Sequence, residues 1–196
     1  MKVKLEALGL PYELVHGEKP DLKDVKFSEV RGCNFVHDRG DGSYIAGVAG
    51  CRRGTLAAIE KGLYDNPEDG FIFCNDDIKF NEDTVKLIKE GIDNLPTDVG
   101  MLGMCTNEFH RARIDAIEGL YSRANEDYCR FEWMCYLRPW FAWYYIEAIK
   151  SLPLESDRCI QEYRKQHGYP EVYILNKSAA EYDNEAQAEA HLHYKS

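Results

Sequence analysis

The sequence predicts an α/β fold in which a mostly parallel central sheet is flanked by helices. The apolar run at 71–74 is short and rich in strand-forming residues, which indicates a buried strand. Apolar residues recur at a helical spacing before this run, over 55–64, and after it, over 82–95. A second apolar run at 99–105 follows, and alternating helices and strands are typical of a parallel sheet. The chain of 196 residues is long enough for one domain.

The elements expected in the first part of the chain are separated by turn residues. Gly9 ends a first helix, and Asp65-Asn66-Pro67 ends the last helix before the central strand. In order, we expect the end of a helix over 1–10, strands over Tyr12–Val15 and Asn34–His37, a turn-rich loop over 38–43 and a helix over 55–64.

After the strand at 71–74, helix caps and prolines mark the remaining elements. Asn81 is expected to cap a helix that Pro96 closes. Pro153 is expected to end a helix over 146–152, and Ser156 to cap another that runs to His167. Further strands are expected over 99–105 and 172–175.

Composition restricts the class of function. The formal net charge of −10, from 34 acidic and 24 basic residues, disfavours general nucleic-acid binding, which needs a basic surface. No stretch approaches the ~20 apolar residues of a transmembrane segment, and the first residues do not resemble a signal peptide. The seven cysteines are odd in number and form no CxxC pair. We therefore expect free thiols, a cytoplasmic location and no nucleic-acid partner.

The most informative segment is Asn75-Asp76-Asp77, which directly follows the predicted strand at 71–74. Adjacent carboxylates at the end of a buried strand are costly unless a cation meets them. Carboxylate oxygens are the ligands that Mg²⁺ and Mn²⁺ prefer, and these ions bind phosphates. The triplet therefore predicts a site for a metal and a diphosphate. The structural alternative is a turn with solvated carboxylates.

A calcium-binding loop overlaps this segment as a second alternative. Two observations count against a calcium loop. Pro67 occupies a position where such a loop needs a ligand, and the residues after Gly70 indicate a strand, whereas a calcium loop is followed by a helix. The residues that match positions one, five, six, eight and twelve are Asp65, Asp69, Gly70, Ile72 and Asp76.

Residues 34–105 resemble the nucleotide-sugar glycosyltransferases of the GT-A fold. The resemblance lies in Gly54 to Leu63 (GTLAAIEKGL) followed by Phe71 to Phe80 (FIFCNDDIKF). The turn at 36–43 is similar to family 2 near the donor base, whereas residues 8–15 are similar to family 25, the lipopolysaccharide-type transferases. Two departures are that Asn75 replaces the first acidic residue and that the opening strand is either missing or Tyr12–Val15.

The resemblance implies a metal-dependent hexosyltransferase that moves a sugar from a nucleotide-diphosphate donor, a UDP-sugar, to a glycan or glycoconjugate acceptor. Residues 1–105 would form the nucleotide and metal half, and residues 106–196 the acceptor half and C-terminal tail. Asp77 would bind Mn²⁺ or Mg²⁺ together with His191 or His193, and Asn75 and Asp76 would orient the ribose and the metal-bound water. Other residues that could contact the donor are Asp38, Arg52, Arg53 and Lys195.

Residues of the second half would serve the acceptor. Asp157, ahead of Glu155, is the candidate general base, because the resemblance implies a carboxylate at such a helix start. Both residues could equally be helix-capping carboxylates. Trp140 is the candidate for stacking on an acceptor sugar, within an aromatic block at 133–145 that otherwise indicates core. Two other functions stay open, namely a non-catalytic degenerate transferase domain that binds glycan or protein and a metal-dependent nucleotidyltransferase.

Overall fold

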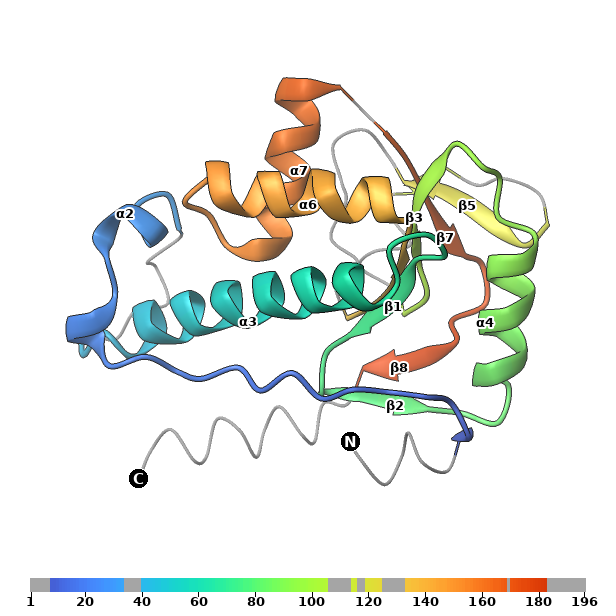
Figure 1. The fold of residues 1–196 in the computed structure, drawn as a ribbon, viewed down its shortest axis with the longest axis horizontal. Coiled ribbons are helices and arrows are strands. Elements are labelled where there is room, and N and C mark those ends of the chain that lie inside the picture. The colour runs from blue at the N-terminus through green and yellow to red at the C-terminus, as the bar shows by residue number, and fades with distance from the viewer. Residues whose placement is uncertain are drawn as a thin grey trace. The chain divides into compact units, whose positions relative to one another are not determined.

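In a computed structural model of the chain, the residues described are 8–33, 40–105, 114–115, 119–124, 133–168 and 170–182. They form two compact units, each built from segments that are distant in the sequence (Figure 1). The sheet unit comprises Met1–Glu13, Ile72–Leu137 and Pro170–Ser196. The helical unit comprises Leu14–Phe71 and Arg138–Tyr169. Each unit thus draws on both halves that the sequence suggested.

The main sheet has six strands in the order β1-β6-β3-β7-β5-β4. β3 and β7 are parallel, whereas the pairs β3–β6, β5–β7 and β4–β5 are antiparallel. The α/β class is confirmed, but the expectation of a mostly parallel sheet is wrong. The strands are β1 (Phe71–Cys74), β3 (Val99–Gly103), β4 (Ile114–Asp115), β5 (Tyr121–Ala124), β6 (Met134–Leu137) and β7 (Glu171–Leu175).

The error in strand direction has a topological cause. Alternating helices and strands imply parallel pairing only when successive strands are neighbours in the sheet. Here β6, from later in the chain, lies between β1 and β3 and runs antiparallel to β3. The insertion of β6 between β1 and β3, which local sequence does not encode, therefore replaced the expected parallel neighbour of β3 with an antiparallel one.

A second, two-stranded sheet follows the acidic triplet. β2 (Ile78–Phe80) pairs antiparallel with β8 (Ala180–Tyr182), so that Lys79 lies opposite Glu181. The helix α4 (Thr84–Asp93) comes next. It begins later than predicted, because Asn81 forms the preceding turn, in which its Oδ1 accepts a hydrogen bond of 3.0 Å from the Asp83 N–H.

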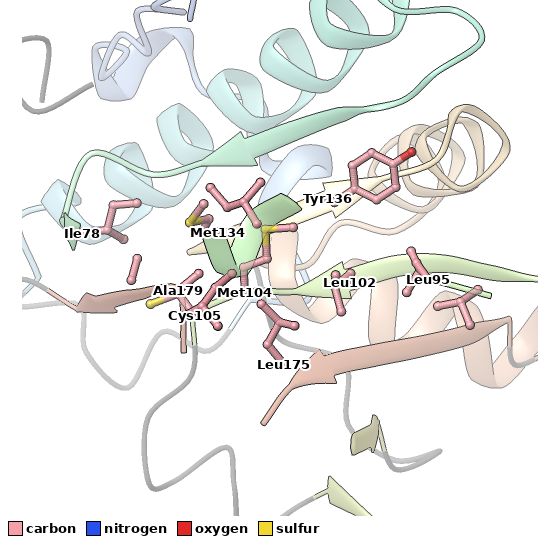
Figure 2. Packing of buried hydrophobic residues seen from close by; sticks show 13 residues of the cluster. Ile78, Leu95, Leu102, Met104, Cys105, Met134, Tyr136, Leu175 and Ala179 are labelled. Carbon is pink, nitrogen blue, oxygen red and sulfur yellow. The ribbon is translucent and has the colours of Figure 1, made fainter. Parts of the chain in front are cut away.

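The core of the sheet unit lies among these strands and α4. Figure 2 shows side chains from β2, β3, β6 and β7 converging with Ala179, which precedes β8. Gly91 of α4 permits close packing, because a Cβ atom there would lie 3.0 Å from Leu175 Cδ2 and 3.1 Å from Leu102 Cδ2. This packing holds the ends of the strands, and with them the acidic triplet, in place.

The helical unit is built on the long helix α3 (Ser43–Asp65) with α6 (Pro139–Ser151) and α7 (Ser156–His167). Two short helices, η1 (Leu22–Asp24) and α2 (Phe27–Val30), precede α3. The predicted helices at 55–64 and 146–152 are confirmed, but both begin earlier. Gly42, at a φ of 73°, starts α3, and Pro139 occupies the first turn of α6, where its fixed φ suits a helix.

The predicted strands have different outcomes. The strands at 71–74 and 172–175 are confirmed, and the one at 99–105 ends at Gly103, with Cys105 forming a single bridge to Ala180. The expectation that the strand at 71–74 is buried and central is wrong, because β1 lies at an edge of the sheet and only its Phe73 is buried. The strand expected over Tyr12–Val15 is wrong, because this segment has no regular secondary structure and no partner strand. The strand expected over Asn34–His37 lies outside the described residues.

Candidate functional site

The acidic triplet lies where β1 ends and β6 begins. The Asn75 N–H donates a hydrogen bond of 2.9 Å to the Trp133 carbonyl oxygen. The Met104 N–H, just beyond β3, donates one of 2.8 Å to the carbonyl oxygen of Met134. Because Trp133 and Met134 are adjacent, the carboxyl ends of β1 and β3 lie on either side of the start of β6. Ligands of open α/β sheets bind outside the carboxyl ends of strands.

The segment that enters β8 is held against the same place. The Ala179 N–H donates a hydrogen bond of 2.8 Å to the Met104 carbonyl oxygen, and Cys105 pairs with Ala180. Thr84 Oγ1, at the start of α4, donates a bond of 2.6 Å to the Ala179 carbonyl oxygen. These contacts, two between backbone groups and one from the Thr84 side chain, therefore fix the chain around the triplet.

The two carboxylates of the triplet differ in burial. Asp76 is exposed, whereas Asp77 is half-buried and its Oδ1 atom is fully buried. Asn75 is half-buried. One carboxylate is thus held within the protein while its neighbour can reach a ligand from solvent.

Two thiols beside the triplet reveal its negative charge. Burial, and then the carboxylates of Asp76 and Asp77, raise the pKa of Cys74 to about 11. Burial, and then Asp77 and Glu181, raise the pKa of Cys105 to about 12. Both thiols therefore keep their protons near neutral pH when no metal is bound. The carboxylate oxygens of Asp76 and Asp77 are donors of the kind that Mg²⁺ and Mn²⁺ prefer.

Glu181 is the residue of this site that sequence reasoning missed. It is exposed on β8 and acts on Cys105 together with Asp77. Its strand is only three residues long and pairs with β2, which is distant in the sequence. No local pattern signals such a pairing, so Glu181 could be found only from the fold.

The fit of the site to a metal is partial within the described residues. Within the described ranges, no three histidine, cysteine, aspartate or glutamate side chains lie close enough together to hold a metal ion. Asp76 and Asp77 offer the right kind of donor, and water or other parts of the chain would have to complete the shell. The predicted ligands His191 and His193, and the predicted donor contacts Asp38 and Lys195, lie outside the described residues.

The two predicted phosphate-binding arginines belong to the helical unit and have protein partners there. Arg52 is buried, and its Nη2 donates a hydrogen bond of 2.7 Å to the Ile149 carbonyl oxygen. Its Nη1 contacts the Leu154 carbonyl oxygen and Cys159 Sγ. Arg53 binds both carboxylate oxygens of Glu29, at 3.0 and 3.1 Å. These contacts give each arginine a structural role, and phosphate binding stays a prediction.

The predicted general bases lie at the start of α7. Glu155 occupies the N-cap position, and its Oε2 accepts a hydrogen bond of 3.0 Å from Arg158 Nη1. Asp157 lies in the first turn and is half-buried. Ser156, which the sequence predicted as the cap, is instead the first helical residue. A capping position and a catalytic role are both compatible with this geometry.

The aromatic block is divided between core and surface. Tyr136, Phe141 and Tyr145 are buried, Trp133 and Tyr144 are half-buried, and Trp140 and Trp143 are exposed, so less of the block is core than the sequence predicted. Trp140 is exposed over 43% of its surface, as a residue that contacts an acceptor must be.

Comparisons with known proteins give no match. No protein-family model matches the chain, and no curated protein matches it. Among the described residues, no helix combines the length and the apolar character that crossing a membrane requires.

Proposed function

We propose that this chain is a metal-dependent glycosyltransferase that moves a hexose from a UDP-sugar to a hydroxyl of a glycan or glycoconjugate. A single GT-A-like domain over residues 1–196 is part of this proposal. The observation that carries it is the acidic triplet at the end of β1, beside the end of β3, with Asp76 exposed and one Asp77 oxygen buried. Strand ends of this kind bind ligands in α/β sheets, and the oxygen donors suit a cation that binds diphosphate.

Each candidate residue then has a defined task. Asp77 would hold Mn²⁺ or Mg²⁺, and Asp76 and Asn75 would orient the ribose and bound water. When bound, such an ion supplies Lewis-acid stabilisation of charge on the departing diphosphate. Asp157, or Glu155, would accept the proton of the attacking hydroxyl. Because donor glycosidic bonds are already activated, positioning is expected to supply most of the rate.

Thermal unfolding with nucleotides tests this function directly. UDP, GDP and CMP are each added with and without Mn²⁺. Saturating UDP should raise Tm by about 5–10 °C, but only with Mn²⁺, because the ligand stabilises the folded state by about 2.7 kcal/mol at 100 times its Kd. CMP, which lacks the diphosphate, is the matched control. Equal shifts with and without Mn²⁺, or no shift with any diphosphate, would contradict the proposal.

Two product assays separate the alternatives. A transferase releases UDP from a UDP-sugar, whereas a nucleotidyltransferase releases pyrophosphate from UTP and a sugar phosphate. A non-catalytic domain that binds glycan or a protein partner would release neither product. Asn75, which adds no charge where the family has an acidic residue, is the observation that favours this last alternative.

A further inference from the structure

We propose that α6 carries a platform for neutral sugar rings, formed by Trp140, Trp143 and Glu147. This inference rests on the proposed function only in identifying the bound sugar as the acceptor of the transferase. The acceptor would then be a carbohydrate, and Trp143 and Glu147 would contact it together with Trp140, the contact that the sequence predicted.

The three side chains lie on one face of the helix. Positions three and four apart are neighbours on a helix surface, so Trp143 lies between Trp140 and Glu147. All three are exposed, Trp140 over 43% and Trp143 over 59% of their surfaces. The other face of α6 is packed into the core of the helical unit through Phe141, Ala142, Tyr145, Ile146, Ala148 and Ile149. The tryptophans therefore face solvent on a rigid support.

Contacts on both sides fix the edges of this face. Towards α3, Lys150 Nζ forms an ion pair of 2.8 Å with Glu60 Oε1. Towards α7, the Tyr144 ring meets the Tyr163 ring edge-on at 4.9 Å. The Trp140 ring lies edge-on to Phe141, with centroids 5.6 Å apart. The contact with Phe141 restricts the Trp140 ring, so this ring loses less conformational entropy when a ligand binds.

The exposed area is suited to sugar rings rather than to a protein. Together the two tryptophans expose about as much surface as one whole tryptophan, roughly 250 Å² at most. A stable protein partner needs about 800 Å² on each side. Two adjacent indole rings offer flat apolar surfaces of the size that one or two sugar rings can cover.

Charge disfavours anionic ligands with flat or apolar faces, because Lys150 is paired with Glu60 and interacts with Glu147. The chain has a formal net charge of −10, and Glu147 adds an exposed carboxylate at the platform itself. Anionic membranes and nucleic acids would be repelled, since both require basic residues. A neutral sugar has an apolar ring face for the indoles and hydroxyls that can donate to the Glu147 carboxylate.

Binding is measured on the full chain without metal or nucleotide, so the result does not depend on the donor site. The probes are cellohexaose, maltohexaose and chitohexaose, and the signal is the emission of the three tryptophans. At least one probe should change this emission saturably at millimolar concentration or below. Trp140→Ala and Trp143→Ala should each weaken that binding roughly three- to tenfold, and Glu147→Gln should weaken it as well.

The matched control is Tyr64→Ala, which removes another exposed aromatic side chain of the helical unit, 83% exposed at the end of α3. It should leave the affinity for the sugar unchanged. No saturable change with any probe, or equal binding by the Trp140→Ala, Trp143→Ala double variant, would overturn the platform. Binding of UMP or of anionic vesicles that needs both tryptophans would also overturn it. The Mn²⁺-dependent UDP shift, measured separately, reports on the transferase proposal alone.

Discussion

The backbone N–H of Asn75 donates a hydrogen bond of 2.9 Å to the carbonyl oxygen of Trp133. This bond connects the acidic triplet to the residue that immediately precedes β6. The triplet is therefore anchored through its backbone. The Asp76 side chain is exposed to solvent, where it can reach a ligand, and changing it should affect binding more than folding.

Replacing Asp77 with alanine should reduce Mn²⁺-dependent UDP binding at least about tenfold, because a coordinating carboxylate is lost. Calorimetry measures the affinity, and circular dichroism checks that the fold persists. Asp98→Ala, which removes an exposed carboxylate before β3, is the control and should bind normally. Unchanged UDP binding in a folded Asp77→Ala protein would remove the basis for a metal site at the triplet.

His191→Ala and His193→Ala should differ in their effect, because one coordination position is expected to be filled by one histidine. The damaging substitution should lower Mn²⁺ affinity, and removal of residues 184–196 should reproduce it with little change in the free energy of unfolding. Lower pH should mimic the loss around an ordinary histidine pKa of about 6.5 or below, since a protonated imidazole cannot bind metal. Full metal affinity and donor turnover in the shortened protein would refute this role.

Arg52→Met should lower the free energy of unfolding by about 2–4 kcal/mol, because two buried carbonyl oxygens, of Ile149 and Leu154, lose their charged donor. The neighbouring Arg53→Met is the control and should cost about 1 kcal/mol or less, since its pair with Glu29 is partly exposed. Urea denaturation measures both. If Arg52→Met instead left stability intact and weakened nucleotide binding, the predicted phosphate role of Arg52 would be correct.

Two glycines of α3 should respond in opposite directions to alanine. A Cβ atom at Gly50 would lie 2.9 Å from the Glu18 carbonyl oxygen and 3.2 Å from Lys19 Cα, both backbone atoms. Gly50→Ala should therefore destabilise the protein by about 1–3 kcal/mol. Gly47 has open space around its Cβ position, so Gly47→Ala should stabilise the helix by about 0.5–1 kcal/mol. Equal effects in denaturation experiments would mean that residues 18–20 do not pack on α3.

Cys33 should make stability fall at high pH. Burial, and then the Glu155 carboxylate, raise the pKa of this thiol from 9.0 to about 11 in the folded state. Between these values the unfolded chain releases a proton that the folded protein keeps, so this contribution to stability is complete below pH 9 and is lost as the pH rises towards 11. Denaturation of Cys33→Ala over this range should show a smaller loss. Cys74 and Cys105 are present in both proteins, so parallel curves would show that Cys33 does not contribute.

Local patterns in the sequence predicted the elements whose signals are local. The strand at 71–74 is a short apolar run, and the helix to His167 is bounded by Pro153 and a polar start, so both were found. The acidic triplet was recognised because it directly follows an apolar run that indicates a strand. The first half of α3 was missed because its glycines, including Gly47 and Gly50, weaken the helical pattern.

The sequence by itself determined the α/β class, the position of the triplet after β1 and the exposure of Trp140. Only the tertiary structure decided that β6 lies between β1 and β3, that Glu181 acts beside Asp77, and that Arg52 is buried against the carbonyl oxygens of Ile149 and Leu154. Secondary structure depends on the spacing of apolar residues within a short segment, so it can be predicted from the local sequence. Strand order, interactions between charges and buried hydrogen bonds connect residues that are far apart in the chain. These interactions stabilise the protein only after the chain has folded and has brought those residues together.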